Sequence, residues 1–417
     1  MDPETQHLTT SSATSSFLNT CFNGLNALSG FATMGFSGSR ILLGVGIITV
    51  PYALAAGGWL SLLLLFTIAI STFYTGLLIK RCMDTDPTIR SYPDIGDRAF
   101  GKTGRIIVLI LINMELYLVA TGFLIMEGDN LSNMFPQMDF DILGVHVSSK
   151  KSFVIIVAAI ILPTTWLNNM RLLSYISASG VLASLIVLGS VLWVGVFDGV
   201  GLQEKGRLVS WNGMPSAISL YAFCYGVHPV LPTLYTSMRN KHQFSKVLLL
   251  CFVFSTVTYS SMAVIGYLMF GSKVESQITL SLPTDKTSSR VAIFTTLVTP
   301  ILKYALLVTP IVDSIKERLL YSFNTKKYSL LIKTSLVITT VVVAIALPFF
   351  GDLMSLVGAL LIVAASSILP SLCYLKISGT YKIFGLELVL IGFIVLIGIL
   401  VAIMGTYTAL ADILRKL

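Results

Sequence analysis

The sequence predicts an all-α membrane protein that crosses the bilayer many times. Its 417 residues are 55% hydrophobic and only 12% charged, whereas a soluble domain carries about 25% charged residues. Apolar runs of roughly 20 residues recur along the chain, and a helix of that length spans the hydrocarbon core. Because membrane proteins gather lysine and arginine in their cytosolic loops, the net charge of +8 does not indicate a nucleic-acid partner.

A polar tail at residues 1–16 lacks the features of a signal peptide, and we expect it to be short, disordered and cytosolic. Residues 17–417 then form one transmembrane domain of about eleven helices. The apolar segments lie at about 17–57, 59–79, 106–130, 153–167, 172–197, 214–238, 247–270, 291–315, 330–347, 353–375 and 386–410. Between the second and third segments, part of 91–105 resembles a short interfacial helix. Lysine and arginine are more frequent in the loops that a cytosolic N-terminus would place in the cytosol, which favours that orientation.

Two of these segments are interrupted by residues that weaken helices. The first contains the glycine-rich stretch Asn26–Tyr52, and the sixth contains Gly226, Pro229 and Pro232. At membrane depth, such breaks persist only where the freed backbone groups are buried in protein or line a cavity. Two broken helices five segments apart indicate an inverted-repeat transporter with its site at the bilayer midplane. The alternative is a pair of ordinary proline kinks.

Several motifs spread over almost the whole chain carry a family resemblance. They are VGIITVPYALAAGGW at 45–59, SYPDIGDRAFGKTGR at 91–105, EGDN at 127–130, LPTTWLNNMRLLSYISASG at 162–180, YAFCYGVHPVLPTLYTSM at 221–238 and TPILKYALLVTPI at 299–311. On these motifs the chain resembles the amino acid/auxin permease family, and within it the plant and fungal vacuolar amino acid transporters of the AVT type.

The resemblance implies a LeuT-type fold, in which two five-helix repeats are inverted relative to each other and an eleventh helix is appended. It also implies amino acids as substrates, a vacuolar membrane, a proton gradient as driving force, no cofactor and a monomer. Unwound backbone of the first and sixth helices would hold the substrate's carboxylate and amine, as exposed amides and carbonyls suit those groups. By position, the substrate-binding residues are Asn26, Ser29, Gly30, Val45, Gly46, Phe223, Cys224 and Gly226.

The first segment departs from the family pattern through an atypical insertion. Residues 31–44 separate Asn26–Gly30 from Val45–Tyr52, and removing them would restore the pattern. The whole segment is about twice as long as a bilayer crossing requires, and Arg40 near its middle would cost about 3 kcal/mol at a helix centre. Three explanations stay open: an alternative transcript or gene-model error, a bulge displaced into the aqueous vestibule, or an extra span.

Four further residues are candidates for coupling to an ion. Glu115 and Lys303 are charges at membrane depth that would either pair with each other or sense the proton. His228 titrates in a range suited to an acidic lumen, although a histidine in a broken helix can also simply hydrogen-bond exposed backbone. Thr299 lies where sodium-coupled LeuT-type transporters bind the ion with hydroxyls, so sodium coupling stays open.

The sequence contains no nucleophile–base motif, no phosphate-binding loop and no metal cluster, so we expect no enzyme activity. Two alternatives to transport remain. Some relatives of this fold act as amino acid sensors, usually through a long N-terminal tail, and the insertion at 31–44 would also fit an inactive isoform.

Overall fold

Helices account for almost all of the structure. The computed structural model describes residues 20–21, 46–136, 140–142, 145–166, 170–319, 326–382 and 384–417. Its longer helices are α2 (Gly46–Gly57), α3 (Ser61–Thr85), α4 (Tyr92–Met134), α5 (Ser149–Trp166), α6 (Met170–Val196), α7 (Met214–Cys224), α9 (Phe244–Phe270), α11 (Thr287–Leu319), α12 (Lys326–Ala346), α14 (Leu369–Ser378) and α15 (Leu386–Lys416). Shorter helices are α8 (Leu231–Ser237), α10 (Ile278–Ser281) and α13 (Phe350–Leu356), with 3₁₀ turns η2 (His228–Val230), η3 (Lys241–Gln243), η4 (Gly271–Lys273) and η7 (Thr380–Lys382).

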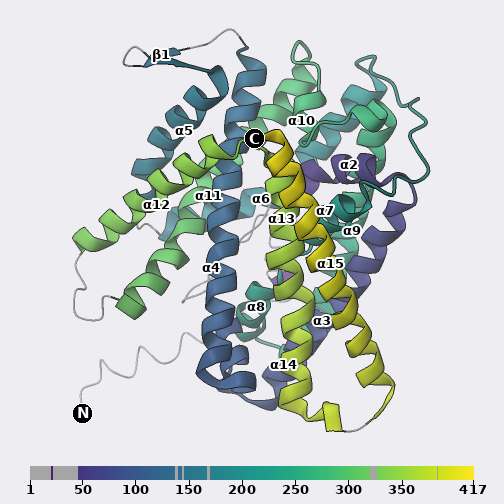
Figure 1. Ribbon diagram of the computed structural model, residues 1–417, viewed down its shortest axis with the longest axis vertical. Coiled ribbons are helices and arrows are strands. Elements are labelled where there is room, and N and C mark those ends of the chain that lie inside the picture. Colours follow the sequence, from purple (N-terminus) through teal and green to yellow (C-terminus); the bar gives the residue numbers. More distant parts are fainter. Residues whose placement is uncertain are drawn as a thin grey trace.

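In the described part of the chain, nine helices are long and apolar enough to cross a membrane. Two shorter apolar helices, Gly46–Gly57 and Leu182–Val196, correspond to the first and fifth expected segments. The prediction of an all-α, multi-pass architecture is therefore confirmed. One small departure is an antiparallel hairpin of β1 (Phe140–Ile142) and β2 (Val145–Val147), which lies in the connection from α4 to α5 at one end of the bundle (Figure 1).

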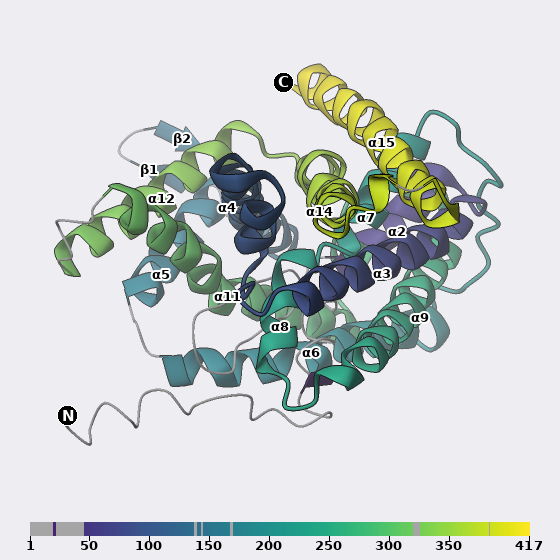
Figure 2. The same ribbon diagram turned by 90° about the horizontal axis from the view of Figure 1, so that it is seen from below.

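The helices form two groups that pack around the centre of the molecule. On one side α4, α5, α11 and α12 contact one another, and on the other side α2, α3, α7 and α9 do so (Figure 2). The tenth segment, which runs from α13 to α14, lies between the groups, and α15 packs on the outside against α7 and α13. The side chains that converge here are mostly apolar and fully buried, so the core sits where the broken helices meet.

The helix α4 begins with the interfacial turn that the sequence predicts. Ser91 and Asp94 form a capping box, in which the Asp94 carboxylate accepts the Ser91 backbone N–H at 2.9 Å. Gly101 then interrupts the helical path with a φ of 66°, a conformation that glycine adopts without steric cost. The short piece before Gly101 is thereby set apart from the long span that follows.

The sixth segment is broken as predicted, and the tenth contains an irregularity that the sequence does not announce. The helix α7 ends at Cys224, and the chain passes through Tyr225–Val227 and the turn η2 before α8 begins. In the tenth segment, residues of η5 (Val357–Ile362) and η6 (Ala364–Ile368) are wound as π-helix. Such windings are uncommon and occur frequently at functional sites.

A loop covers the end of α2 on the side of the molecule where α10 lies (Figure 1). Backbone bonds join Trp59 N–H to the Arg207 carbonyl at 3.1 Å, Leu60 N–H to the Leu208 carbonyl at 3.0 Å and Ser210 N–H to the Gly57 carbonyl at 3.0 Å. The Trp59 indole also donates to the Lys205 carbonyl at 2.9 Å. The turn between α2 and α3 is thus fixed to the segment that leads into α7.

Candidate functional site

The first turn of α2 lies directly against the last turn of α7. The Gly46 carbonyl accepts the Thr49 hydroxyl at 3.0 Å, and the Cys224 thiol lies 3.7 Å from the same oxygen. A methyl group added at Gly46 would come within 3.0 Å of Cys224 Sγ and 3.3 Å of its Cα. Glycine at this position therefore allows the two helix ends to touch, and it brings together two of the residues predicted to bind substrate, Gly46 and Cys224.

These two helix ends carry opposite partial charges. An α-helix leaves its first N–H groups and its last carbonyls without partners in the same helix, and the described part of α2 begins at Gly46 while α7 ends at Cys224. The helix dipoles add positive potential at the α2 end and negative potential at the α7 end. A buried junction of this kind favours a small molecule that carries a carboxylate and an ammonium group close together.

The broken part of the sixth segment is held in place by Tyr225. Its side chain is fully buried, and its hydroxyl lies 2.8 Å from the Thr256 hydroxyl on α9. The Tyr225 ring also stacks on Phe252 with a centroid distance of 5.8 Å and meets Tyr259 edge-on at 5.7 Å. These contacts fix the break to α9 through the Tyr225 side chain and do not use the backbone groups of the break. Sequence reasoning missed this residue, because a tyrosine in an apolar run gives no special signal.

The π-wound tenth segment approaches the break from the other side. A methyl group at Gly226 would lie 2.8 Å from Ile362, and one at Gly358 would lie 2.0 Å from the Ser219 carbonyl and 3.1 Å from Phe223. Phe223 is buried in this contact between α7 and the tenth segment. The predicted residues Phe223, Cys224 and Gly226 thus all lie where the first, sixth and tenth segments converge.

His228 connects three segments by hydrogen bonds. Its Nε2 lies 3.1 Å from the Thr72 carbonyl, which can only accept, so Nε2 carries the proton. Nε2 also lies 2.9 Å from the Thr75 hydroxyl, which in turn donates to the Ser366 carbonyl at 2.6 Å. The histidine thereby joins the sixth segment to α3 and, through Thr75, to the tenth. This arrangement favours the structural alternative for His228 over an ion-coupling role.

Replacing His228 with alanine should lower the free energy of unfolding by about 2 kcal/mol, because the buried Thr72 and Thr75 groups lose their donor. Glutamine can supply a side-chain N–H, so His228→Gln should lose about half as much or less. Thermal unfolding of the purified variants in detergent measures both. Equal stability of the wild type and His228→Ala would contradict the linking role.

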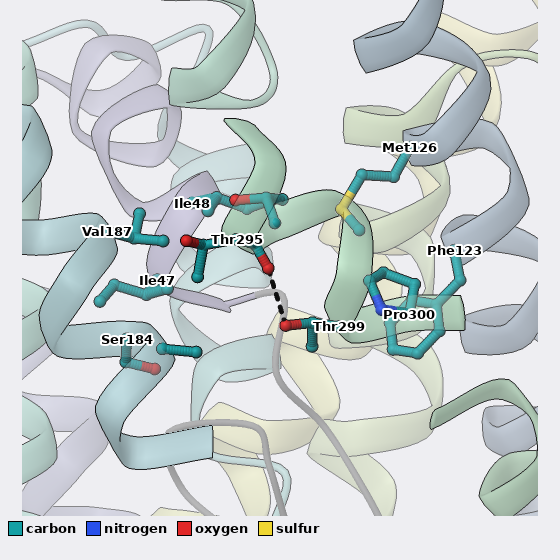
Figure 3. Close-up of a pocket in the computed structure, with 11 residues that line it drawn as sticks. Ile47, Ile48, Phe123, Met126, Ser184, Val187, Thr295, Thr299 and Pro300 are labelled. Atoms are coloured by element: carbon teal, nitrogen blue, oxygen red, sulfur yellow. Dashed lines mark hydrogen bonds between the residues drawn. The ribbon is translucent and has the colours of Figure 1, made fainter. Parts of the chain in front are cut away.

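A small cavity lies beside the first turn of α2 (Figure 3). It is lined by Ile47 and Ile48 of α2, Phe123 and Met126 of α4, Ala183, Ser184 and Val187 of α6, and Thr295, Thr296, Thr299 and Pro300 of α11. Its volume is about 20 Å³, enough for about one water molecule. The Thr299 hydroxyl donates to the Thr295 carbonyl at 2.9 Å, which leaves its oxygen free to accept a further bond. Thr299 is thus a residue of the cavity wall whose oxygen can still accept a hydrogen bond.

Two carboxyl groups of α4 are buried without full hydrogen bonding. Glu115 is 2% exposed and its Oε1 has no partner, and Glu127 is 1% exposed with neither oxygen bonded. Lys303 is also buried, on α11, and its pairing with Glu115, which the sequence suggests, stays a prediction. Sequence reasoning passed over Glu127 because it belongs to a motif at the end of an apolar run, a position where an exposed carboxylate is expected.

The remaining predicted residues lie outside the described part of the chain. They are Asn26, Ser29, Gly30 and Val45, together with the insertion at residues 31–44. The predictions for them stay predictions. The described site consists of α2, which is the second half of the first segment, together with the broken sixth segment and the tenth segment.

Comparisons with known proteins find relatives that match nearly the whole chain. The chain is 55% identical over 401 residues to the amino acid transporter AVT1I of Arabidopsis thaliana, covering 96% of both chains. It is 58% identical over 404 residues to the amino acid transporter AVT1J of the same plant, covering 96% of this chain and 92% of the relative. Its fold matches the crystal structure of MhsT in complex with L-phenylalanine with a TM-score of 0.56 at 10% identity, over 94% of this chain and 99% of that one.

The structural match shows that the chain has the LeuT-type fold. The model of the family described as transmembrane amino acid transporter protein matches residues 25–411, which is nearly the whole chain. The chain therefore belongs to the transmembrane amino acid transporter family.

Proposed function

We propose that this chain is a secondary active transporter that binds its amino acid between the first turn of α2 and the break after α7. The observation that carries the proposal is the contact of two oppositely charged helix ends at Gly46 and Cys224. The α-carboxylate would accept N–H groups at the start of α2, and the α-ammonium would donate to carbonyls at the end of α7. Both groups are common to all amino acids, so this contact recognises the class.

Alternating access would work by moving the first and sixth segments together against the rest of the protein. The contacts of Gly46 with Cys224, and of the loop before α7 with the turn after α2, make these segments one body. The cavity beside Ile47 is far smaller than an amino acid, so substrate entry requires this body to move against α4, α6 and α11. Such rocking of one repeat element around a midplane site is typical of inverted-repeat transporters.

Proton coupling fits the buried carboxyl of Glu115 better than it fits His228. A buried carboxylate without full hydrogen bonding is costly in its charged form, so a change in its surroundings readily changes its proton occupancy. His228, in contrast, uses Nε2 to link two segments in its neutral form.

The resemblance to vacuolar transporters supports a vacuolar membrane, and the distribution of lysine and arginine supports a cytosolic N-terminus. Thr299 keeps sodium open as an alternative ion.

Uptake of a labelled amino acid mixture into proteoliposomes tests transport. We expect the labelled amino acids to accumulate inside the vesicles when a pH gradient is imposed. An ionophore that collapses the gradient should release the accumulated amino acids. A sensor would bind amino acids without moving them, so saturable binding with no uptake at any imposed gradient would replace the proposal by the sensor alternative. Repeating the assay with a sodium gradient identifies the ion.

Deleting residues 31–44 should increase uptake, because it joins the two halves of the first segment into one continuous binding element. Vesicles that contain equal amounts of the full chain and of the deletion variant are compared under the same gradient. Removing an equally long part of the polar tail, residues 3–16, provides the control. Unchanged or lower uptake after removing 31–44 would show that the insertion does not impair the site.

A further inference from the structure

A second cavity, open to the outside, lies between the last turns of α6 and the start of α11. Its volume is about 640 Å³, much larger than the cavity beside α2. It is lined along the helices by Ile186, Gly189, Trp193 and Val291, and at its rim by Asp198, Asp285 and Lys286. None of these residues belongs to the site described above.

The wall along the helices faces the bilayer. Ile186 is 37% exposed, Trp193 54% and Val291 43%, and all three lie on segments that cross the membrane. Trp193 packs on Phe197 with ring centroids 4.4 Å apart, and tryptophan gathers at the level where hydrocarbon meets head groups. A side chain added at Gly189 would meet no atom within 4 Å, so this glycine leaves the groove open.

The rim is polar and carries more negative than positive charge. The Asp198 carboxylate accepts a hydrogen bond from the Ser288 hydroxyl, which fixes its position. Lys286 lies 3.7 Å from Asp285, a loose pair that leaves the lysine side chain 43% and the aspartate side chain 72% exposed. Two carboxylates and one ammonium at the rim repel an anionic head group and attract a cationic one. The single lysine still offers a partner for one phosphate.

We propose that this groove binds a phospholipid of the phosphatidylethanolamine class. The ethanolamine ammonium would donate to Asp198 and Asp285, the phosphate would contact Lys286, and one acyl chain would lie along Ile186, Gly189 and Val291. An ammonium with N–H groups forms charge-assisted hydrogen bonds with carboxylates, whereas choline has no N–H to donate. The site therefore discriminates between head groups of equal charge. The groove lies on the outer surface, and lipid binding there does not depend on transport.

Lipid binding to the purified, delipidated full chain tests the site. Native mass spectrometry would count bound phosphatidylethanolamine, phosphatidylcholine and phosphatidylglycerol with the same acyl chains. We expect the ethanolamine lipid to bind about tenfold more tightly than the other two, as charge-assisted hydrogen bonds to the carboxylates would allow. Equal binding of the ethanolamine and choline lipids would overturn the proposal. If soluble phosphoethanolamine displaced the bound lipid at the same concentration as the intact ethanolamine lipid does, the acyl chain would not contribute, and the proposal would also be overturned.

Two variants locate the binding. Gly189→Leu fills the groove and should reduce binding at least tenfold, while Gly392→Leu, on the lipid-facing helix α15 where an added side chain also meets no atom within 4 Å, should bind as the wild type does. Asp285→Asn should remove the preference for ethanolamine over choline and needs no change in packing, so it tests the site even if Gly189→Leu does not fold. Wild-type binding and preference in both variants would place the lipid elsewhere.

Discussion

Replacing Gly46 with valine should lower amino acid uptake about tenfold or more. Replacing Cys224 with alanine in the same variant should restore part of the lost uptake. The first methyl group at Gly46 would already lie 3.0 Å from Cys224 Sγ, and valine adds two more. Overpacking of this kind costs about 1–3 kcal/mol, and 1.4 kcal/mol corresponds to a factor of ten. The cost falls on the contact that we propose to hold the substrate.

A double-mutant cycle separates this effect from general damage. Cys224→Ala alone should transport nearly as the wild type does, because the Gly46 carbonyl keeps the Thr49 hydroxyl as a donor. Gly46→Val with Cys224→Ala should exceed Gly46→Val alone, since the sulfur that clashes is gone. Gly392→Val serves as the control for a glycine replaced on an exposed helix face. Additive losses in the double variant would mean that the two helix ends do not act as one site.

The sequence predicts the helices well and their interruptions only in part. Gly226, Pro229 and Pro232 together correctly predict the broken sixth segment. Proline alone is a poor guide, because Pro300 and Pro310 both lie within the continuous helix α11. Neighbouring helices can satisfy the carbonyls that a proline leaves free. The sixth segment differs because Gly226, three residues before Pro229, adds backbone freedom where Ile362 of the tenth segment packs against it.

The π-wound tenth segment could not be predicted from its residues. It contains no proline between Phe350 and Ile368, and its winding accompanies a contact with another segment, where Gly358 approaches the Ser219 carbonyl. The hydrogen bonds around His228 are equally remote in sequence, since its partner Thr75 lies on the second segment and Thr75 in turn donates to Ser366 on the tenth. Local patterns give the residues that can break or bury a helix, and only the fold decides which of them meet.

The pair of Glu115 and Lys303 illustrates the same limit. Both residues are buried, as their positions within apolar segments suggest, and Oε1 of Glu115 has no hydrogen-bond partner. Opposite charges at membrane depth predict a partner, but the rotation of each helix determines which side chain it faces. For Glu115 the outcome matters, because a buried carboxyl with an unpartnered oxygen is costly to keep charged and therefore readily exchanges a proton.

Replacing Glu115 with glutamine should abolish accumulation driven by a pH gradient while leaving exchange of amino acids across the membrane intact. Glutamine has the same shape but holds no exchangeable charge, so the step that links proton movement to substrate movement is lost. The ratio of internal to external amino acid should fall to about one, and the gradient should no longer alter it. Uptake and counterflow in proteoliposomes, measured at several imposed gradients, give both quantities.

Two matched variants make the assignment to Glu115 specific. Glu127→Gln changes the second buried carboxyl of the same helix, which lies near the C-terminal end of α4. This variant should leave the coupling intact. His228→Gln should also keep the dependence on pH, because its role is to link segments through Nε2. Loss of coupling in Glu127→Gln with normal coupling in Glu115→Gln would move the proton site twelve residues along α4, about 18 Å by the rise of a helix. Loss in His228→Gln alone would instead make the histidine the coupling residue, because glutamine supplies the N–H that the link requires but cannot carry the proton.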